Sequence, residues 1–338
     1  MKRVGIVGCG GIAHVHAEVL SHMETVELCA FADIRPERAE EFAAKLGGNA
    51  YPSLESMLEN ESLDALHICT PHVLHVPMAI SALQKGLHVV MEKPPAISEE
   101  QMAELQKVLA EHPNQQLAVS FQNRYNAGTQ FVKKLLDEKT YGKVLGARAF
   151  VTWKRDESYY TQSGWRGSWQ TEGGGVLINQ SIHTLDLLRY LLGEPKSVEA
   201  HVTNHHLKSV IEVEDTAEAY IEFPGCYALF YATTAFCTDS PVLLEIICEK
   251  AALRLEGDEV TVTQNGQKPE KQEFPPLPHA GKNCWGASHQ ALIGDFYRCV
   301  EKGQHFAIDY QEACRTLRLM LGIYLSSQTG EPTVVETI

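Results

Sequence analysis

Two residues, Lys93 and His183, carry side chains whose ordinary chemistry is proton transfer. Lys93 directly follows a short apolar strand, and partial burial beside another positive charge would lower the pKa of its ammonium group. His183 lies in a helical run with Asn179 four residues before it and Asp186 three residues after it, so both can share its helix face. Two alternatives stay open, a lysine paired with Glu92 and a hydrogen-bonded core histidine. We take Lys93 and His183 as candidate catalytic residues.

A glycine-rich run near the N-terminus predicts a dinucleotide site. It reads Gly8-Cys9-Gly10-Gly11-Ile12-Ala13 and matches G-x-G-x-x-A between a predicted strand and a predicted helix, where backbone N–H groups and the helix dipole attract a pyrophosphate. Asp33 ends the next strand about 20 residues on, where a carboxylate can accept from a ribose 2′-hydroxyl. Asp33 favours NAD, although Arg35 and Arg38 leave NADP possible, and a turn that serves packing alone is the alternative. The predicted cofactor contacts here are Gly8, Gly10, Gly11, Ile12, Asp33, Ile34 and Arg38.

The elements that must position these residues fall into two domains. Up to Gln122, β-branched runs alternate with helical periods, which predicts an α/β doubly wound parallel sheet of the Rossmann type with helices on both faces. From Asn123 onward, strands follow one another directly, which predicts an α+β domain with a large, open, mostly antiparallel sheet. The predicted domains are 1–122, for the dinucleotide, and 123–338, for the substrate and for contacts between subunits.

The element boundaries follow from the periodicity and the turn residues. In the first domain the predicted strands are Val4–Val7, Val26–Ala32, Ala65–Cys69, His88–Met91 and Leu117–Phe121, and the predicted helices are Ile12–His22, Pro36–Leu46, Leu74–Lys85 and Glu99–Glu111. In the second domain the predicted helices are Ala127–Asp137, Ile178–Leu192, Ser288–Lys302 and Tyr310–Gln328.

The composition excludes several classes of partner. The formal net charge is −14 and no segment clusters Lys and Arg, which excludes a nucleic-acid surface. No apolar segment is long enough for a signal peptide or a membrane span, so we expect a cytoplasmic protein. Nine cysteines, including Cys284, never fall in a Cys-x-x-Cys spacing, which predicts reduced thiols. The histidines outside the motifs, including His14, His16, His279 and His289, lack ligand spacing, so we predict no metal site.

Five motifs in order along the chain resemble the glucose–fructose oxidoreductase / inositol dehydrogenase / rhizopine-catabolism (Gfo/Idh/MocA) family. They are Gly8 to Ala13, Thr70-Pro71-His72 with His75, Glu92-Lys93-Pro94, Gln122 to Asn126, and Gly173-Gly174-Gly175 through His183 and Asp186. The resemblance covers essentially the whole chain. It implies hydride transfer between a nicotinamide cofactor and a secondary alcohol or ketone of a sugar, cyclitol or sugar derivative.

The resemblance also implies roles for individual residues. Lys93 would be the general acid/base or a substrate ligand, and His183 would bind or deprotonate the reacting hydroxyl. The residues implied to line the cofactor are Thr70, Pro71, His72, His75, Glu92, Lys93, Gln122, Trp165 and Arg166, and those implied to contact the substrate are Lys93, Trp165, Asn179 and His183. We add Tyr160 as a substrate contact because it lies in an aromatic segment before the triple glycine, and aromatic rings suit the apolar faces of sugar rings. The triple glycine suggests a close backbone approach to something bulky. Homodimers or homotetramers are expected.

One departure from the family pattern concerns position 179. The inositol dehydrogenase branch has Asp there, whereas this chain has Asn179, whose amide can orient a hydroxyl but cannot take its proton. This difference predicts a substrate other than that of the inositol branch. Two further functions stay open: a glycosidase that uses NAD only transiently, and a cofactor-sensing regulator that performs no catalysis.

Overall fold

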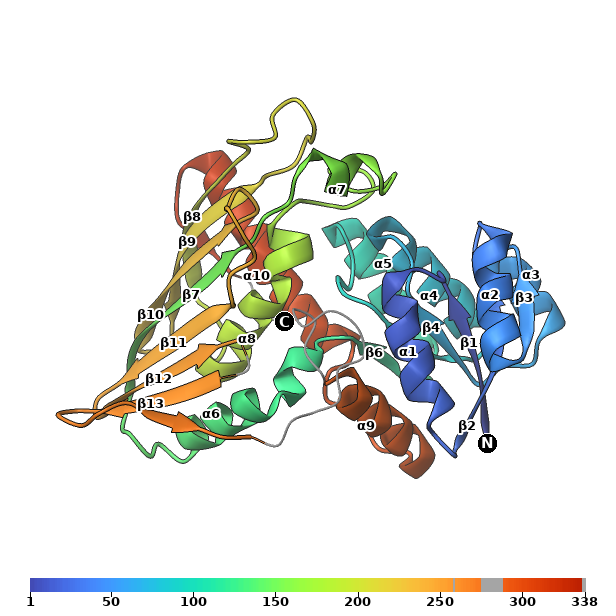
Figure 1. Ribbon diagram of the computed structural model, residues 1–338, viewed down its shortest axis with the longest axis horizontal. Helices are drawn as coiled ribbons and strands as arrows, with labels where there is room; N and C mark the ends of the chain where they lie inside the picture. The colour runs from blue at the N-terminus through green and yellow to red at the C-terminus, as the bar shows by residue number, and fades with distance from the viewer. Residues whose placement is uncertain (258, 275–287, 336–338) are drawn as a thin grey trace. The chain divides into compact units, whose positions relative to one another are not determined.

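The computed structural model of the chain describes residues 1–257, 259–274 and 288–335, so His279 and Cys284 lie outside the described residues (Figure 1). The chain divides into two compact units, 1–122 with 278–314 and 123–277 with 315–338. Residues 288–314 group with the first unit, far along the chain from the rest of it. The reason is helix α9 (His289–Lys302), whose buried face packs against α1 (Gly11–Ser21).

The first unit is a parallel six-stranded sheet with strand order β3-β2-β1-β4-β5-β6. Its strands are β1 (Lys2–Val7), β2 (Val26–Ala32), β3 (Asn49–Tyr51), β4 (Ala65–Ile68), β5 (His88–Met91) and β6 (Leu117–Val119). Its helices, besides α1 and α9, are α2 (Pro36–Leu46), α3 (Leu54–Asn60), α4 (His75–Gln84) and α5 (Glu99–Glu111). The order reverses between β1 and β4, and open α/β sheets bind ligands at such a point, beyond the carboxyl ends of the strands. Gly8, Thr70 and Glu92 lie just beyond the ends of β1, β4 and β5.

The second unit is a nine-stranded sheet with order β14-β13-β12-β11-β7-β10-β9-β8-β15. Its strands are β7 (Val144–Thr152), β8 (Ser197–Thr203), β9 (Thr216–Phe223), β10 (Cys226–Thr233), β11 (Leu243–Cys248), β12 (Ala251–Glu256), β13 (Glu259–Gln264), β14 (Glu270–Gln272) and β15 (Thr333–Val334). Only the β7–β10 pair is parallel among the pairs that the structure describes, so the expected mostly antiparallel sheet is confirmed. Its helices are α6 (Ala127–Asp137), α7 (Glu157–Thr161), α8 (Ile182–Leu192) and α10 (Tyr310–Thr329). Helices α6 and α8 contact the sheet from one side (Figure 1).

The elements that the sequence did not predict are short. They include β3, α3 and α7, which have too few residues to show a hydrophobic period. The structure also differs from the predicted helix Ile178–Leu192 at its start. This segment begins as a π-helical turn over Leu177–Ser181, and α8 follows it. In the described ranges, no helix combines the length and the apolar character needed to cross a membrane.

Candidate functional site

The glycine turn after β1 has space and free donors on one side and close packing on the other. A Cβ on Gly8 would lie 2.7 Å from the backbone of Cys69, whereas a Cβ on Gly10 would meet nothing within 4 Å. Gly10 also caps α1 without any side-chain hydrogen bond, so the first N–H groups of the helix are not used by a capping side chain. This arrangement fits a pyrophosphate approaching Gly10 and the start of α1.

Asp33 ties this turn to the end of β2. Its carboxylate accepts hydrogen bonds of 2.8 Å from the N–H groups of Cys9 and Arg35. Each carboxylate oxygen can accept a further bond, so ribose hydroxyls remain compatible with these contacts. The neighbouring Ile34 is 86% exposed, which leaves an apolar side chain at the predicted nucleotide site. Arg38 is half-buried in α2.

His75 joins the loops that follow β4 and β5. Its Nδ1 lies 2.9 Å from the carbonyl oxygen of Pro94, and its Nε2 lies 2.9 Å from that of Thr70. Burial lowers the pKa of His75, and the two carbonyl oxygens act in the opposite direction. The ring is completely buried, so its visible role is to hold Thr70 and the Lys93-Pro94 segment in place. His72 and Gln122, also implied to line the cofactor, are buried as well.

The carboxylate of Glu92 ends a buried chain of hydrogen bonds. We assign the tautomers so that Tyr297 donates to His67 Nε2 (2.9 Å), His67 Nδ1 donates to His16 Nδ1 (2.7 Å), and His16 Nε2 donates to Glu92 Oε1 (3.0 Å). Burial alone would raise the pKa of Glu92. The hydrogen bonds and charges of His16 and His289 have the larger effect and hold the pKa of Glu92 well below its usual value. For His16 and His67, burial lowers the pKa of the imidazole, so both rings are neutral.

Three members of this cluster could serve as metal ligands. One ligand atom each from His16, Glu92 and His289 lies within 4.8 Å of the other two, and all three residues are buried. Two imidazoles and a carboxylate form a donor set that suits zinc. The hydrogen bond from His16 to Glu92 accounts for the closest contact without an ion. Sequence spacing did not indicate this cluster because His289 comes from α9, far along the chain.

In the second unit, a long buried segment exposes two predicted residues. From 172 to 189 every residue is buried except Asn179 and His183, which are half-exposed. The π turn carries Asn179 and α8 carries His183, and π turns inside helices frequently occur at functional sites. The predicted common face of these two side chains is therefore the one part of this segment that a ligand can reach.

Asn179 is held by a carboxylate that the sequence analysis did not single out. Its Nδ2 donates to Glu172 and lies 3.4 Å from the hydroxyl of Tyr159. Gln180 donates to the same hydroxyl at 3.1 Å, and the guanidinium of Arg166 lies 4.4 Å from the Tyr159 ring centroid. Trp165 stacks on the same guanidinium at 4.7 Å.

Tyr160, which we expected at the substrate, is only 4% exposed. It packs in an apolar cluster with Leu207, Ile211 and Val213, and burial raises the pKa of its phenol. The hydroxyl of Tyr160 lies 3.5 Å from that of Thr234, and it is the neighbouring Tyr159 whose hydroxyl contacts Asn179.

The triple glycine is required by the protein's own packing. A Cβ on Gly174 would lie 2.1 Å from the hydroxyl of Tyr324, and a Cβ on Gly175 would lie 1.9 Å from the carbonyl oxygen of Glu214. The bulky group expected beside these glycines is therefore part of this unit. Glu214 also accepts hydrogen bonds from the N–H groups of Gly175 and Leu177. The start of the π turn is thereby fixed to Glu214.

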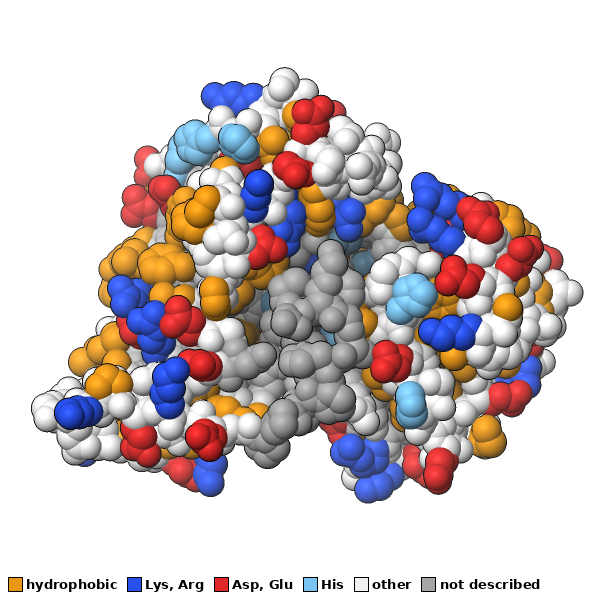
Figure 2. Space-filling model, viewed as in Figure 1, with side chains coloured by type: hydrophobic (Ala, Val, Ile, Leu, Met, Phe, Trp, Pro, Cys, Tyr) orange, Lys and Arg blue, Asp and Glu red, His pale blue; other side chains and the backbone are white. Residues whose placement is uncertain are grey.

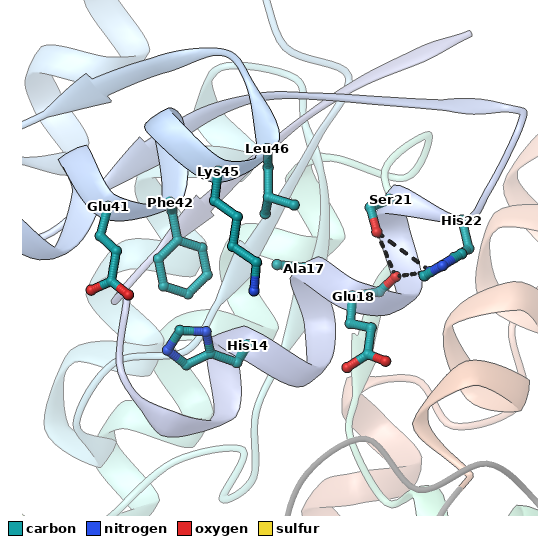
Figure 3. A pocket seen from close by; sticks show the side chains of 9 residues that line it. All are labelled: His14, Ala17, Glu18, Ser21, His22, Glu41, Phe42, Lys45 and Leu46. Atoms are coloured by element: carbon teal, nitrogen blue, oxygen red, sulfur yellow. Dashed lines mark hydrogen bonds between the residues drawn. The ribbon is translucent and has the colours of Figure 1, made fainter.

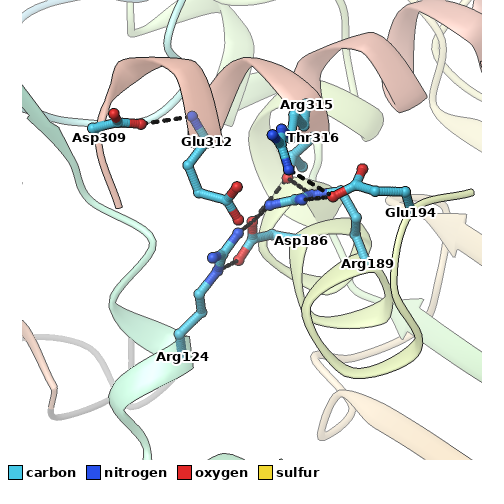
Figure 4. A network of polar contacts seen from close by, with 8 residues as sticks. All are labelled: Arg124, Asp186, Arg189, Glu194, Asp309, Glu312, Arg315 and Thr316. Atoms are coloured by element: carbon cyan, nitrogen blue, oxygen red, sulfur yellow. Dashed lines mark hydrogen bonds and ion pairs between the residues drawn. The ribbon is translucent and has the colours of Figure 1, made fainter. Parts of the chain in front are cut away.

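Asp186 has a structural role in the same unit. Its carboxylate accepts from Arg124 (2.6 and 2.7 Å) and from the hydroxyl of Thr316 (2.8 Å), as Figure 4 shows. Burial alone would raise the pKa of Asp186, but the Arg124 guanidinium lowers it and keeps the carboxylate ionised. Arg189 extends the network to Glu194. These contacts fix α8 against the element that carries Arg124, so Asp186 orients the helix that bears His183.

A pocket in the first unit lies away from all of these residues. It is formed by α1 and α2, and its lining includes His14, Glu18, Phe42 and Lys45 (Figure 3). None of the predicted cofactor or substrate residues contributes to it. His14 stacks on Phe42 with ring centroids 4.5 Å apart, which partly fills the space. We assign no role to this pocket.

Comparison with known proteins identifies both units. A family model described as the oxidoreductase family with an NAD-binding Rossmann fold matches residues 2–121, and the GFO/IDH/MocA C-terminal domain matches residues 129–254. Glucose-6-phosphate 3-dehydrogenase of Bacillus subtilis is 31% identical over 65% of this chain and 64% of its own, and D-glucoside 3-dehydrogenase of Escherichia coli is 33% identical over 59% and 57%. These matches therefore span less than two thirds of each curated relative.

A solved structure extends the similarity over the full chain. The WlbA dehydrogenase from Bordetella pertussis, crystallised with NADH and UDP-GlcNAcA, superposes with a TM-score of 0.86 at 29% identity and covers 99% of each chain. The predicted fold class is confirmed, and the first unit matches an NAD-binding Rossmann family, in agreement with the predicted cofactor.

Proposed function

Because this chain belongs to the GFO/IDH/MocA oxidoreductase family, we propose that it is an NAD-dependent dehydrogenase that oxidises a secondary ring hydroxyl of a sugar, cyclitol or sugar derivative, or reduces the matching ketone. The observation that carries this proposal is the exposure of Asn179 and His183 alone within the buried segment 172–189. The two curated relatives are named for dehydrogenation at a ring position of glucose derivatives, which supports the class.

The first unit offers a fitting place for NAD. The open space beside Gly10 and the start of α1 suit the pyrophosphate, and the anchored carboxylate of Asp33 suits the adenosine ribose. The exposed Ile34 suits an apolar contact with the adenine ring. Bound NAD supplies the acceptor for the hydride that leaves the ring carbon. The negative charge of Asp33 would repel a 2′-phosphate, which favours NAD over NADP.

Lys93 and His183 are the groups to which we assign proton transfer. The strand β5, buried from Val89 to Met91, and the His75 contact with Pro94 fix the backbone on both sides of Lys93. His183 lies one turn after Asn179, so the imidazole can exchange a proton with a hydroxyl that the Asn179 amide orients. Since an amide cannot take a proton, the base is Lys93 or His183.

The substrate class has two candidates with different support. The curated relatives favour a glucoside or a sugar phosphate. The WlbA complex favours a nucleotide-linked sugar acid, because that similarity extends over the whole chain. A glycosidase that uses NAD transiently remains the alternative reaction, and it would consume no net NAD.

The test is a screen for NADH formation with saturating NAD against methyl glucosides, glucose 6-phosphate, inositols and UDP-linked sugar acids. Lys93→Ala should lower kcat by a factor of about 10² to 10⁴, the usual value of a positioned acid or base. Lys85→Ala, which removes an exposed lysine at the end of the preceding helix, should leave turnover unchanged. Equal turnover by Lys93→Ala and the wild type would contradict the role of Lys93. Tight NAD binding without NADH from any compound would contradict a simple dehydrogenase.

We also propose that two copies associate through the uncovered face of the nine-stranded sheet. Large apolar side chains are exposed on its strands, and hydrophobic side chains gather over this sheet at the left of Figure 2. They include Leu145, Tyr220, Tyr227, Leu229 and Ile247. Tyr220 and Tyr227 stack with centroids 4.8 Å apart, which makes a flat apolar surface.

Free buried thiols such as Cys69 and Cys248 suit the cytoplasmic location that we propose.

A further inference from the structure

Glu172 is the buried group that touches the exposed part of the proposed substrate site. Its side chain is completely buried, and it lies seven residues before Asn179 on the far side of the triple glycine. One carboxylate oxygen accepts from the N–H of Gly167 at 2.6 Å, and the other accepts from Nδ2 of Asn179. Glu172 therefore contacts Asn179 from inside the unit.

This contact fixes the direction of the Asn179 amide. An ionised carboxylate can only accept hydrogen bonds, so the NH₂ end of the amide must face Glu172. The hydroxyl of Tyr159 lies on the same side, 3.4 Å from Nδ2. With Nδ2 directed to these two groups, the carbonyl oxygen Oδ1 is directed away from them.

We propose that Glu172 is a positioning residue that selects which end of the Asn179 amide faces the substrate. Ionised Glu172 turns Oδ1 outward, to accept from the hydroxyl of an alcohol. Protonated Glu172 donates to Oδ1 and turns the NH₂ group outward, to donate to the oxygen of a ketone. This inference rests on the proposed function, since it assigns opposite states of one side chain to the two directions of the same reaction.

The pKa of Glu172 lies near neutral pH, so both of its protonation states can be populated. Burial raises the pKa of Glu172 to about 7, while the Gly167 N–H, Asn179 and Arg166 lower it and the charge of Glu214 raises it. Further titratable groups that interact with Glu172 include the phenols of Tyr159, Tyr160 and Tyr324. Burial raises the pKa of each of these phenols, so they remain neutral.

The surroundings permit the amide to turn. A protonated Glu172 facing Nδ2 would place two donors against each other, and a rotation of the amide by about half a turn replaces this contact with an O–H···O bond. Tyr159 can follow, because its hydroxyl accepts in one arrangement and donates to Oδ1 in the other. Gln180 still donates to the Tyr159 hydroxyl in both arrangements. The proton comes from solvent, and no covalent bond other than the O–H bond changes.

The first test observes the amide directly and needs no substrate. In protein labelled with ¹⁵N at asparagine, the side-chain NH₂ signal of Asn179, identified by its loss in Asn179→Ala, should shift in one step near pH 7. Glu172→Gln keeps the size and hydrogen-bonding capacity of the side chain but cannot ionise, so the step should vanish. Glu214→Gln removes the other buried carboxyl whose pKa is raised to about 7 but does not touch Asn179, so the step should remain.

Infrared spectroscopy of the wild type supplies a measurement that depends on no variant. Difference spectra between about pH 5 and about pH 9 should contain a buried carboxylic acid signal that titrates with the Asn179 shift. A Glu172 carboxylate that never protonates in this range would overturn the proposal. So would an Asn179 signal that stays constant while Glu172 takes up its proton.

The second test links the amide to catalysis. For whichever compound of the panel is turned over, kcat/KM for oxidation in the wild type should contain a break near pH 7 below which it falls, about tenfold per pH unit. That break should be absent in both Glu172→Gln and Asn179→Ala, while breaks from other groups remain. An unchanged profile in both variants would overturn the assignment to the substrate. A titrating amide in a protein that oxidises nothing in the panel would support the polarity switch and reject the proposed function.

Discussion

Two completely or almost completely buried carboxylates, Glu92 in the first unit and Glu172 in the second, respond to burial in opposite ways. Burial raises the pKa of both, yet Glu92 ends well below its usual value and Glu172 ends at about 7. The difference lies in the partners. Glu92 has His16 and His289 beside it, whereas the hydrogen bonds described for Glu172 come from the Gly167 N–H and the Asn179 amide, and the charge of Arg166 also lowers its pKa. Burial therefore does not by itself decide the charge of a carboxyl group; the donors facing it do.

The comparison also separates two kinds of role. A carboxylate that stays ionised can hold a fixed chain of neutral histidines in one arrangement, which suits the scaffold behind Lys93. A carboxyl group that exchanges its proton near neutral pH can change the arrangement of its neighbours, which suits the segment that presents Asn179.

The largest expected effect comes from removing Glu92. In Glu92→Ala the N–H of His16 loses its acceptor inside the core, and a cavity remains, so the free energy of unfolding should fall by about 3 kcal/mol. Glu104→Ala, on the exposed face of α5, should change it by less than about 0.5 kcal/mol. Denaturant unfolding followed by circular dichroism measures both. Similar values for the two variants would mean that the hydrogen-bond chain contributes little.

A smaller effect should appear in the pH dependence of the two units, with opposite signs. His16 and His67 have lowered pKa values when folded, so their contribution is complete above the ordinary histidine value of about 6.5 and is lost as the pH falls. Glu172 has a raised pKa, so its contribution is complete below the ordinary glutamate value of about 4.5 and is lost as the pH rises to about 7.

Hydrogen exchange resolved by peptide can separate these two slopes. Between about pH 5 and about pH 7, corrected protection should rise in α1 and β4 and fall in the segment around the π turn. Glu172→Gln should remove part of the slope in the second unit and leave that of the first unit unchanged. If protection changed with pH in the same direction in both units, the contrast between their buried ionisable groups would be contradicted.

The sequence revealed the parts of this site that depend on local spacing. The glycine turn, Asp33 at the end of β2, and the helical segment that carries Asn179 and His183 could all be predicted, because each depends on residues close together in the sequence. The alternation of strands and helices predicted the parallel sheet, and the uninterrupted strands predicted the second sheet for the same reason.

The partners across the fold could not be predicted. Glu172 meets Asn179 only because the triple glycine and the π turn bring the chain back on itself, and no spacing rule describes that path. Which of Tyr159 and Tyr160 faces Asn179 depends on the rotation of the short helix α7, which has too few residues to show a period. His289 reaches Glu92 from a helix that the linear domain boundary assigned to the other unit.

The smallest expected effect tests whether the histidine chain has one direction. In the arrangement we assign, Tyr297 is the first donor and Glu92 the last acceptor, so each ring has a single tautomer. Tyr297→Phe removes the donor to His67 Nε2 and should cost about 1 kcal/mol of unfolding free energy. Because the His67 Nδ1–H still donates to His16, ¹⁵N spectra of the rings should show the tautomers unchanged. A switch of His67 to the other tautomer would mean that Tyr297, not Glu92, sets the direction of the chain.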